Sequence, residues 1–475
     1  MNDDRALLDL GVPRRIHVVG AGGTGMSAIA EVLATMGHTV TGSDQAGSAT
    51  VDHLRRLGIV VSIGHDAANV AGAEVVTCST AIPGTNPEVV AAREAGVPVL
   101  RRAEALAAIC AVRRTVAVSG THGKTTTTAM LALALRAAGM EPSFLVGGEV
   151  TGLGSGASWG SDGWFVVEAD ESDGTFVELG AEAVVVTNVE ADHLDHWGSF
   201  DALQAGFRRF LADAEGPRVL CADDPVAAQL ADGLDCLTYG TSDAAGYRMV
   251  DVVPAADGIA FTLLRAGGGP PERLGRIAVD LPGLHNARNA AAAVVAALAL
   301  GADLEPVVAA LAAFPGVRRR WERRGEAAGV SFVDSYDHLP TEVAAALDAA
   351  AAGGHDRVVC VFQPHRYTRT RDLWRDFADA FDGADVLCVT DIYAAGQQPI
   401  PGVTGKLVVD AVLDARPWRR VAWLPTRADV LTYLRAELRS GDLCLTLGAG
   451  DLTTVPDELV ASLRSAPGTT AAAGW

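Results

Sequence analysis

Short apolar runs alternate along the chain with longer stretches rich in alanine. Runs of this length are typical of buried strands, and the alanine-rich stretches between them favour helices. Strands that alternate with helices predict parallel sheets with helices on their faces, which is the α/β class of fold. The predicted strands comprise residues 16–19, 75–78, 116–118, 166–167, 184–187, 358–362 and 386–389.

Three domains are predicted from the places where this alternation restarts. A chain of 475 residues has the length for roughly two to four domains. We expect boundaries after residues 112 and 313, which gives domains at 1–112, 113–313 and 314–475. Within the second domain, residues 249–279 change to short alternating strands around a glycine–proline loop, a pattern typical of an antiparallel edge.

The second domain opens with the stretch SGTHGKTTT, residues 119–127, directly after a predicted strand. A glycine-rich turn between a strand and a helix points backbone N–H groups and a lysine at a polyphosphate. The ammonium would meet phosphate oxygens, the next hydroxyl could ligate Mg²⁺, and the helix expected over residues 126–138 would add its dipole. The sequence therefore predicts an ATP site in a central domain of the P-loop ATPase type, although Val118 stands where an ordinary phosphate loop has a glycine. The predicted ATP-binding residues of this turn are Gly120, Thr121, His122, Gly123, Lys124, Thr125 and Thr126.

A second glycine turn, GAGGTG, begins at Gly20 after the first predicted strand, and Ser43 and Asp44 end the next strand. GxGxxG in this place is typical of a Rossmann-like domain that holds a diphosphate at a helix N-terminus. The motif alone suits NAD, FAD or a nucleotide-sugar diphosphate equally well. Because a hydride-transfer enzyme has little use for an ATP loop, two nucleotide sites favour a ligase or kinase whose acceptor carries a diphosphate.

Acidic residues follow the predicted strand at 166–167, in the stretch EADESD that begins at Glu168. The carboxyl ends of parallel strands share one edge with the phosphate loop, so Glu168 is a candidate Mg²⁺ ligand. A solvated acidic turn is the alternative. The stretch NVEADHLDH, residues 188–196, follows the next strand and brings further acidic and imidazole groups to the same edge. Two metal ions would suit phosphoryl transfer to a carboxylate.

Composition excludes several other classes of protein. A net charge of −20 argues against a nucleic-acid surface, which needs a basic stripe. The longest run of small apolar residues, 290–302, is shorter than the about 18 to 20 residues of a membrane span, and the amino terminus has no apolar signal core. Seven cysteines lie singly along the chain, a usage typical of reduced thiols. We expect a cytoplasmic protein without membrane insertion or nucleic-acid partners.

Six motifs together resemble those of the Mur ligases and occur in that family's order. They are GAGGTGMSAIAEVL, SGTHGKTTTT, EADESD, TNVEADHLDHW, PGLHNARNAAAAV and FQPHRYTRTRDL. The resemblance spans all three predicted domains and implies a Rossmann-like α/β third domain. EADESD and NVEADH favour the alanine-adding branch of the family over the related ligase that attaches whole peptides in recycling.

The resemblance implies an ADP-forming amide ligase of peptidoglycan synthesis. In that chemistry ATP, with Mg²⁺, phosphorylates the lactoyl carboxylate of UDP-N-acetylmuramate. The amine of L-alanine, or of another small amino acid, then attacks the acyl phosphate. The expected assembly is a monomer or a homodimer.

The resemblance also implies roles for individual residues. The catalytic set is Lys124, His193, His365, Arg366 and Arg369. The metal ligands are Thr125, Glu168 and His193. Adenine and phosphate contacts beyond the loop are His285, Asn286, Asn289 and Arg320. The UDP-sugar pocket comprises Gly20, Gly22, Gly23, Thr24, Gly25, Ser43, Asp44, Ser79 and Asn86. The amino-acid pocket comprises Tyr336, His338, His365, Arg366 and Arg369.

On the residues alone, the stretch HRYTRTR at 365–371 is either a basic loop or a site that binds a carboxylate bidentately. The sequence also departs from the family's pattern DDYxHHPTE at Ser335, Asp337 and Leu339, where the family has an aspartate, a small residue and a second histidine. Asp337 could compensate for the lost carboxylate, or the amine pocket could have changed. The alternative function is therefore a paralogue with the same chemistry and a different amine or acid. A dinucleotide oxidoreductase and a catalytically silent binding paralogue are two further alternatives.

Overall fold

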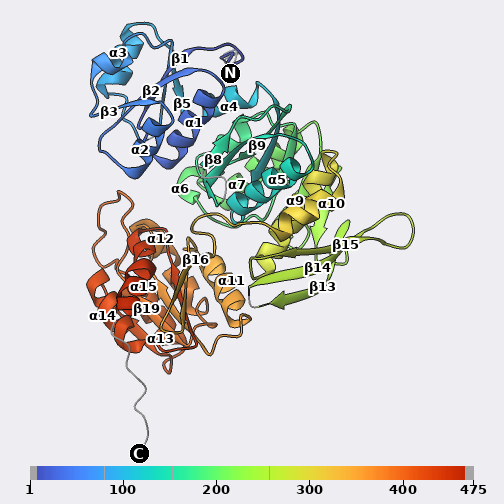
Figure 1. The fold of residues 1–475 in the computed structure, drawn as a ribbon, viewed down its shortest axis with the longest axis vertical. Helices are drawn as coiled ribbons and strands as arrows, with labels where there is room; N and C mark the ends of the chain where they lie inside the picture. Colours follow the sequence, from blue (N-terminus) through green and yellow to red (C-terminus); the bar gives the residue numbers. More distant parts are fainter. Residues whose placement is uncertain (1–7, 80, 152–154, 256, 466–475) are drawn as a thin grey trace, which may run out of the picture. The chain divides into compact units, whose positions relative to one another are not determined.

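The computed structural model describes residues 8–79, 81–151, 155–255 and 257–465, and within them the strands form three sheets (Figure 1). By its internal contacts the chain divides into two compact units. The first unit comprises the described residues up to Val252, with Phe261–Ala278 and Arg288–Pro315. The second comprises Val253–Ala260, Val279–Ala287 and the described residues from Gly316 onward. The predicted boundaries after residues 112 and 313 stay predictions.

The first sheet has the strand order β3-β2-β1-β4-β5, with neighbouring strands parallel. This doubly wound order, which starts from a central β1, confirms the Rossmann-like prediction for this part of the chain. Its strands are β1 (Arg15–Val19), β2 (Thr39–Asp44), β3 (Val60–Ile63), β4 (Val75–Cys78) and β5 (Val99–Arg101). Its helices are α1 (Thr24–Thr35), α2 (Ala49–Arg56), the 3₁₀ turn η1 (Ala67–Val70), α3 (Pro87–Glu94) and α4 (Arg102–Cys110).

The central sheet has the order β15-β14-β13-β12-β11-β10-β6-β9-β7-β8. Strand β6 pairs in parallel with both β10 and β9, so the phosphate loop leaves the middle of this sheet. The strands are β6 (Arg114–Ser119), β7 (Ser143–Val150), β8 (Ser155–Ser158), β9 (Trp164–Glu168), β10 (Ala183–Val186), β11 (Arg218–Cys221), β12 (Leu237–Gly240), β13 (Tyr247–Ala255), β14 (Gly258–Arg265) and β15 (Glu272–Val279). The helices are α5 (Lys124–Ala137), η2 (Thr175–Glu178), α6 (Leu194–Trp197), α7 (Phe200–Asp213), α8 (Pro225–Leu230), α9 (Leu284–Ala299) and α10 (Leu304–Ala312).

The third sheet has the order β16-β17-β21-β18-β19-β20. Only the β16–β17 pair is antiparallel among the pairings described for this sheet. The strands are β16 (Glu322–Ala327), β17 (Val330–Ser335), β18 (Arg357–Phe362), β19 (Val386–Val389), β20 (Val421–Trp423) and β21 (Asp442–Leu447). The helices are α11 (Pro340–Ala351), α12 (Tyr367–Leu373), η3 (Trp374–Ala378), α13 (Lys406–Ala415), α14 (Arg427–Glu437), η4 (Asp451–Thr454) and α15 (Val455–Ser465).

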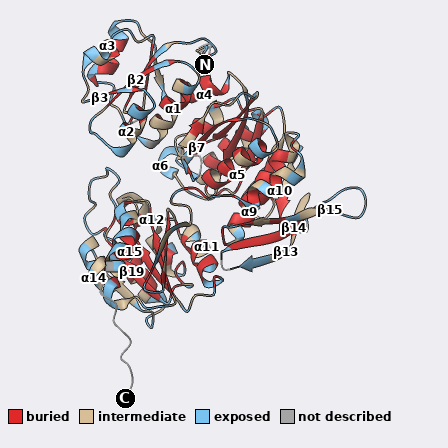
Figure 2. Ribbon diagram, viewed as in Figure 1, coloured by how far each residue is buried: buried red, intermediate tan, exposed pale blue. Residues whose placement is uncertain are grey.

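Burial follows the apolar pattern of the sequence (Figure 2). Strands β10 and β18 are buried along almost their whole length, which matches their continuous runs of valine and other apolar residues. The alanine-rich helix α9 is also buried over residues 290–297, where the small side chains allow close packing. The apolar core therefore lies on both faces of the sheets. The polar residues at the strand ends lie outside it and are candidates for binding sites.

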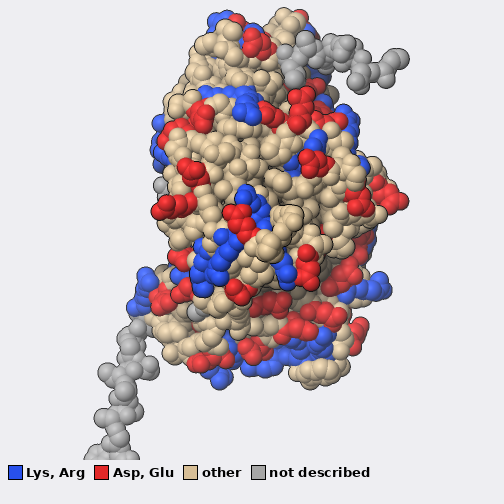
Figure 3. Space-filling model, turned by 90° about the vertical axis from the view of Figure 1, so that its right-hand side faces the viewer, with Lys and Arg blue, Asp and Glu red and all other residues tan. Residues whose placement is uncertain are grey.

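The surface combines both signs of charge despite the net charge of −20. On the face shown in Figure 3, acidic and basic side chains are interspersed. Within the described residues, no helix has the length and apolarity to cross a membrane.

Candidate functional site

The phosphate loop connects β6 to α5 through two glycines with positive φ. Gly120 has φ +134° and Gly123 has φ +80°, conformations that favour glycine. A Cβ on Gly120 would collide with Thr187 Oγ1, and one on Gly123 would collide with Asn289 Oδ1. Space as well as conformation therefore requires glycine at both positions.

Lys124 opens α5, two residues earlier than the sequence predicted. Its Nζ donates to the carbonyl oxygens of Gly120 at 2.6 Å and Thr121 at 3.1 Å, and to Glu171 Oε1 at 3.0 Å. Burial raises the pKa of Glu171 to about 7, against the opposing effect of the nearby ammonium. Burial alone would lower the pKa of Lys124, but Glu171, Asp170 and Glu168 outweigh it and raise that pKa. The lysine is therefore held as a cation in the concave side of the loop.

Two of the three predicted metal ligands lie in contact. Thr125 Oγ1 donates to Glu168 Oε1 at 3.0 Å, and Gly147 N donates to Glu168 Oε2 at 2.6 Å. The parallel register, in which Val118 pairs with Glu168, brings the end of β9 beside the phosphate loop. A hydroxyl and a carboxylate side by side form a pair of hard oxygen ligands that suits Mg²⁺.

His193, the third predicted metal ligand, is placed differently. It precedes α6 with φ 55°, its N–H donates to Asp192 Oδ1 at 2.8 Å, and its Nε2 lies 3.2 Å from Asp192 Oδ2. The described residues contain no group of three or more histidine, cysteine or acidic side chains that could hold a metal ion. The structure thus pairs Thr125 with Glu168 and pairs His193 with Asp192.

The segment after β10 supports the phosphate loop. Thr121 N donates to Asn188 O at 3.0 Å, and His122 N donates to Asn188 Oδ1 at 2.8 Å. His122 Nε2 also lies 3.1 Å from Glu190 Oε2. Thr126 is buried at the start of α5. The loop is therefore fixed from the neighbouring strand.

The residues predicted to contact adenine lie at the start of α9. Asn289 packs against Gly123, as the collision with a Cβ at that glycine shows. The Asn286 amide donates to Pro282 O at 2.8 Å, and His285 lies beside Gly283. On the same helix Arg288 Nε donates to Asp223 Oδ2 at 2.8 Å, a contact that the sequence did not predict.

The first glycine turn is fixed by Asp44 at the end of β2. Gly22 N donates to Asp44 Oδ2 at 2.8 Å, and Gly20 N donates to Ser43 O at 2.9 Å. Gly23 is the N-cap of α1 and Gly25 lies in its first turn. The side chain of Thr24 lies outside the described residues. The glycines and Asp44 thus form one turn, as the motif predicts.

The side chains of Ser43, Ser79 and Asn86 are engaged in hydrogen bonds within the first unit. The Ser43 hydroxyl is buried and donates to Glu88 Oε2 at 2.6 Å. Ser79 Oγ accepts from Ala81 N at 3.0 Å. Asn86 caps α3, since its Oδ1 accepts from Glu88 N at 2.9 Å.

Glu88 was not predicted, although it is the centre of a buried polar network. His65 Nδ1 lies 2.9 Å from Glu88 Oε2, and Asn69 Nδ2 donates to Glu88 Oε1 at 2.6 Å. Burial would raise the pKa of Glu88, but Ser43, Asn69 and His65 stabilise its charged form and the pKa is lowered. An acidic residue two positions after a helix cap carries no sequence signal for such a network.

A cavity of about 160 Å³ lies in the first unit between the first glycine turn and the end of β9. Its lining joins residues from α1, α4, β7, β9 and the turn after β9: Gly25, Ala28, Ile29, Arg102, Leu106, Leu145, Val146, Gly147, Glu168 and Asp170. The predicted diphosphate turn and the Glu168 carboxylate therefore open onto the same space.

Aromatic and imidazole rings cluster on the third sheet. The ring of His338 lies 5.5 Å from that of Tyr336 and 5.2 Å from that of His365. His365 also stacks on Tyr393, with 6.0 Å between ring centroids. The predicted amino-acid residues Tyr336, His338 and His365 are thus brought together, and Tyr393 completes the row without having been predicted.

Arginines flank this row of rings. An Arg369 guanidinium nitrogen lies 3.0 Å from His365 Nδ1. Arg366 adopts φ 66° and its N–H donates to Tyr393 O at 2.9 Å. Arg320 lies over the Tyr336 ring at 5.1 Å, and Arg319 lies over it at 5.0 Å. This cluster offers several cations that could bind a carboxylate.

The residues that depart from the family's pattern lie next to this cluster. Ser335 is buried, and its Oγ accepts from Trp321 N at 3.2 Å. Leu339 is buried at the N-cap of α11, where its N–H donates to Glu342 at 3.1 Å. Asp334, the neighbouring carboxylate, accepts from Thr446 Oγ1 at 2.7 Å and Thr453 Oγ1 at 2.6 Å.

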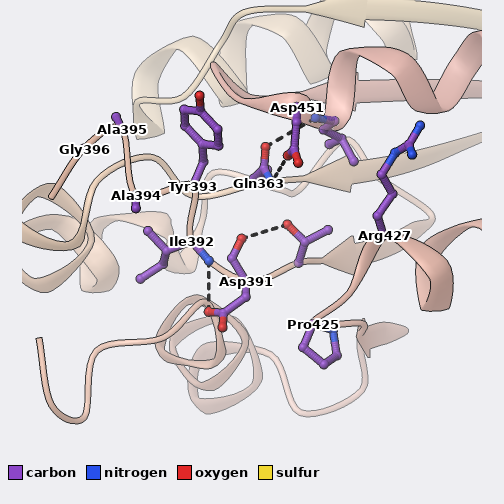
Figure 4. A pocket seen from close by; sticks show the side chains of 12 residues that line it. Gln363, Asp391, Ile392, Tyr393, Ala394, Ala395, Gly396, Pro425, Arg427 and Asp451 are labelled. Atoms are coloured by element: carbon purple, nitrogen blue, oxygen red, sulfur yellow. Dashed lines mark hydrogen bonds between the residues drawn. The ribbon is translucent and has the colours of Figure 1, made fainter. Parts of the chain in front are cut away.

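A second cavity, of about 430 Å³, opens beside Tyr393 (Figure 4). Its polar walls are largely paired with each other: Gln363 Nε2 donates to Asp451 Oδ1 at 2.8 Å, and Asp391 Oδ1 accepts from Ile392 N at 2.9 Å. The close-up shows Arg427 and Pro425 on the side opposite Ala394 and Ala395. The cavity adjoins the predicted amine end of the site.

Parallel sheets with glycine turns at the N-termini of α1 and α5 place this chain in the class of α/β proteins built like nucleotide-dependent enzymes. Three family models match in succession: "Mur ligase family, catalytic domain" over residues 15–114, "Mur ligase middle domain" over 118–297 and "Mur ligase, glutamate ligase domain" over 319–450. The chain belongs to the Mur ligase family.

Curated relatives are similar over nearly the whole chain. The UDP-N-acetylmuramate–L-alanine ligase of Kineococcus radiotolerans is 50% identical over 94% of this chain and 95% of its own length. The protein of the same name from Bradyrhizobium sp. strain ORS 278 is 45% identical over 94% of this chain and 98% of its own length. The crystal structure of the Thermotoga maritima enzyme MurC has a TM-score of 0.81 at 28% identity and covers 96% of this chain and all of its own. These matches confirm the predicted family and the three-part α/β fold.

Proposed function

We propose that this chain is an ATP-dependent ligase that joins L-alanine to UDP-N-acetylmuramate. The observation that carries the proposal is the 50% identity, over 94% of the chain, to a relative of that name. The phosphate loop with Lys124 and the adjacent Thr125–Glu168 pair provides independent support, because an ADP-forming ligase needs both a phosphate cradle and metal ligands.

The proposed reaction has two steps. The γ-phosphoryl group of ATP passes to the lactoyl carboxylate, which forms an acyl phosphate and releases ADP. The amino-acid amine then attacks the acyl carbon, the C–O bond to phosphate breaks, and amide and inorganic phosphate are the products. Lys124 acts in the first step by stabilising charge on the transferring phosphoryl oxygens.

Thr125 and Glu168 fit Mg²⁺, since they supply a hydroxyl and a carboxylate at one point of the loop. The metal would neutralise phosphate charge when bound. We assign His193 as a further ligand on the family resemblance. The residues of this chain orient the phosphates through the first turn of α5 and the backbone of Gly120 to Gly123.

At the amine end, we assign Arg366 and Arg369 to the carboxylate of the amino acid. Tyr336, His338 and His365 would form the walls around its small side chain. A fixed carboxylate leaves the amine oriented for attack on the acyl phosphate. His285, Asn286 and Asn289 would contact adenine, and Arg320 would contact ATP phosphates. We assign the UDP moiety to Gly20, Gly22, Gly23, Thr24, Gly25 and Asp44 with Ser43, Ser79 and Asn86.

The test is formation of the amide from UDP-N-acetylmuramate, L-alanine and Mg-ATP. The reaction is monitored by ADP release, and the product is identified by mass spectrometry. Lys124→Ala should lose activity by several orders of magnitude. Lysine occurs in this sequence only at 124 and 406, and Lys406 lies at the surface paired with Asp410. Lys406→Ala is therefore the matched control and should retain activity.

The paralogue alternative is tested in the same assay with other amines and acids. Glycine and L-serine replace alanine in one series, and other UDP-linked acids replace the muramate in a second. If alanine and UDP-N-acetylmuramate give no ADP while another pair does, the proposed function is wrong. Tyr336, His338 and His365 lie together despite the departures at Ser335, Asp337 and Leu339, which favours the proposed function over the paralogue.

A further inference from the structure

Arg102 opens α4 and lies directly against the first glycine turn. A Cβ placed on Gly25 would lie 3.0 Å from Arg102 Nε and 3.2 Å from its Cζ. Gly25 belongs to the first turn of α1, and no side chain of the described residues caps that helix at Gly23. The guanidinium therefore adjoins a helix N-terminus whose N–H groups favour an anion.

The hydrogen-bonding capacity of Arg102 is poorly used. Its Nη1 lies 3.9 Å from Asp170 Oδ2 and 3.8 Å from Asp173 Oδ2, which is too long for hydrogen bonds. Its Nε is buried and has no hydrogen-bond partner within the described part of the chain. A buried donor without a partner is costly unless a bound group satisfies it.

The adjacent Arg101 provides a contrast within the same chain. It is 58% exposed and donates to Glu178 at 3.0 Å and Glu104 at 3.3 Å. Arg102 is only 24% exposed and lines the 160 Å³ cavity together with Gly25 and Glu168. Of these two neighbours, the buried one faces the space where an anionic substrate would lie.

We propose that Arg102 is a positioning residue for the diphosphate of the uridine diphosphate sugar, an inference that rests on the proposed function. A guanidinium can bind phosphate oxygens with two parallel hydrogen bonds, and it would add a cation to the N–H groups of α1. Asp170 and Asp173 hold the guanidinium near the cavity, and their own negative charge would repel a diphosphate without it. Because the cavity continues to Glu168, a diphosphate fixed at Arg102 directs the rest of the substrate toward the phosphate loop.

The test compares Arg102→Ala, Arg102→Lys and the control Arg101→Ala. Binding of UDP, UDP-N-acetylglucosamine and UDP-N-acetylmuramate is measured by calorimetry without ATP, beside the KM values for UDP-N-acetylmuramate and ATP. Loss of charge-assisted hydrogen bonds should weaken all three ligands by a similar factor, about 10- to 100-fold. The KM for ATP should stay unchanged, Arg102→Lys should recover part of the affinity, and Arg101→Ala should bind like the unaltered chain.

Asp173→Asn separates positioning from a structural role. It removes one carboxylate near Nη1 and keeps the guanidinium. A merely structural bridge would make Asp173→Asn as harmful to UDP binding as Arg102→Ala, and that result would overturn the proposal. Unchanged or tighter UDP binding by Asp173→Asn would support it.

Two further results would overturn the proposal. One is normal UDP affinity in a folded Arg102→Ala variant. The other is weakened binding of UDP-N-acetylmuramate alone, because the lactoyl carboxylate would then be the partner. Failure of the unaltered chain to form the amide would instead count against the proposed function, and the binding measurements would still decide the role of Arg102.

Discussion

Lys124 and Glu171 form a largely buried ion pair, with Nζ 2.8 Å from Oε2. The lysine that a phosphate loop offers to a nucleotide is thus already held by a carboxylate from the turn after β9. A bound phosphate must compete with Glu171 for this ammonium, and the two anions would be close to each other. The charge of Glu171 therefore affects how readily the Lys124 ammonium can bind a phosphate.

Replacement of Glu171 by glutamine should change how stability depends on pH. Burial raises the pKa of Glu171 to about 7 in the folded chain. In the unfolded chain the pKa of this glutamate is the ordinary value of about 4.3. The folded state therefore binds more protons between these values, and this contribution to stability is fully present below the lower value and lost as pH rises through 7.

Thermal unfolding midpoints at pH 5 and pH 8 check this sign. The unaltered chain should lose more stability over this interval than Glu171→Gln does. Lys124 does not titrate in the window, since its pKa is raised above its ordinary value. Parallel pH profiles of the two proteins would contradict the prediction.

Gly123→Ala should weaken ATP binding and lower stability. Alanine at φ +80° is strained by about 1 to 2 kcal/mol, and its Cβ would in addition collide with Asn289 Oδ1. Gly139, at the end of α5, has the same φ of +80°, and a Cβ placed on it would meet no atom within 4 Å among the described residues.

Gly139→Ala is therefore the control that isolates the conformational strain. We expect it to lower the unfolding midpoint while leaving the KM for ATP unchanged. Gly123→Ala should cost more stability and also raise the KM for ATP. Equal effects of the two substitutions on both quantities would show that the contact with Asn289 is unimportant.

Thr125→Val should raise the Mg²⁺ concentration needed for half-maximal activity, whereas Thr125→Ser should stay close to the unaltered chain. Valine matches threonine in shape but lacks the hydroxyl that contacts Glu168 at 3.0 Å. Serine keeps that oxygen. A magnesium titration at saturating ATP distinguishes the two, and indistinguishable titration curves would remove Thr125 from the metal site.

Tyr393→Ala should raise the KM for the amino acid, because it removes the ring that stacks on His365. Loss of such a contact costs about 0.5 to 1.5 kcal/mol, or a factor of up to about ten in kcat/KM. Tyr393→Phe keeps the stack and serves as the control. An increase in the KM for ATP, or equal effects of the two substitutions, would argue against a role at the amine end.

The strands that the sequence predicts best are those buried on both faces. Residues 75–78 and 386–389 form β4 and β19 with the predicted bounds, because a short, mostly apolar run bounded by polar residues has few other solutions. The phosphate loop was predictable for a similar reason. Its glycines adopt positive φ angles that favour glycine, so the sequence itself indicates the backbone geometry of the turn.

Contacts between distant side chains could not be predicted in the same way. The pairing of Lys124 with Glu171 depends on how the turn after β9 folds back, and the stacking of Tyr393 on His365 depends on the neighbouring positions of β18 and β19. Ser43 and Asn86 lie in the expected motifs, yet the Ser43 hydroxyl contacts the distant Glu88 and the Asn86 side chain caps α3. The sequence indicated which segments lie close together. Which of their side-chain atoms are in contact depends on the register of neighbouring strands and on the folding of the turns that follow them.

The distribution of lysine should allow selective chemical labelling of this protein. Lys406 is 57% exposed on α13, while Lys124 is 14% exposed and holds Glu171. An amine-reactive dye at neutral pH should therefore modify one lysine side chain, that of Lys406 in the second unit. Peptide mapping of the labelled chain should therefore find the dye on Lys406 and leave Lys124 unmodified.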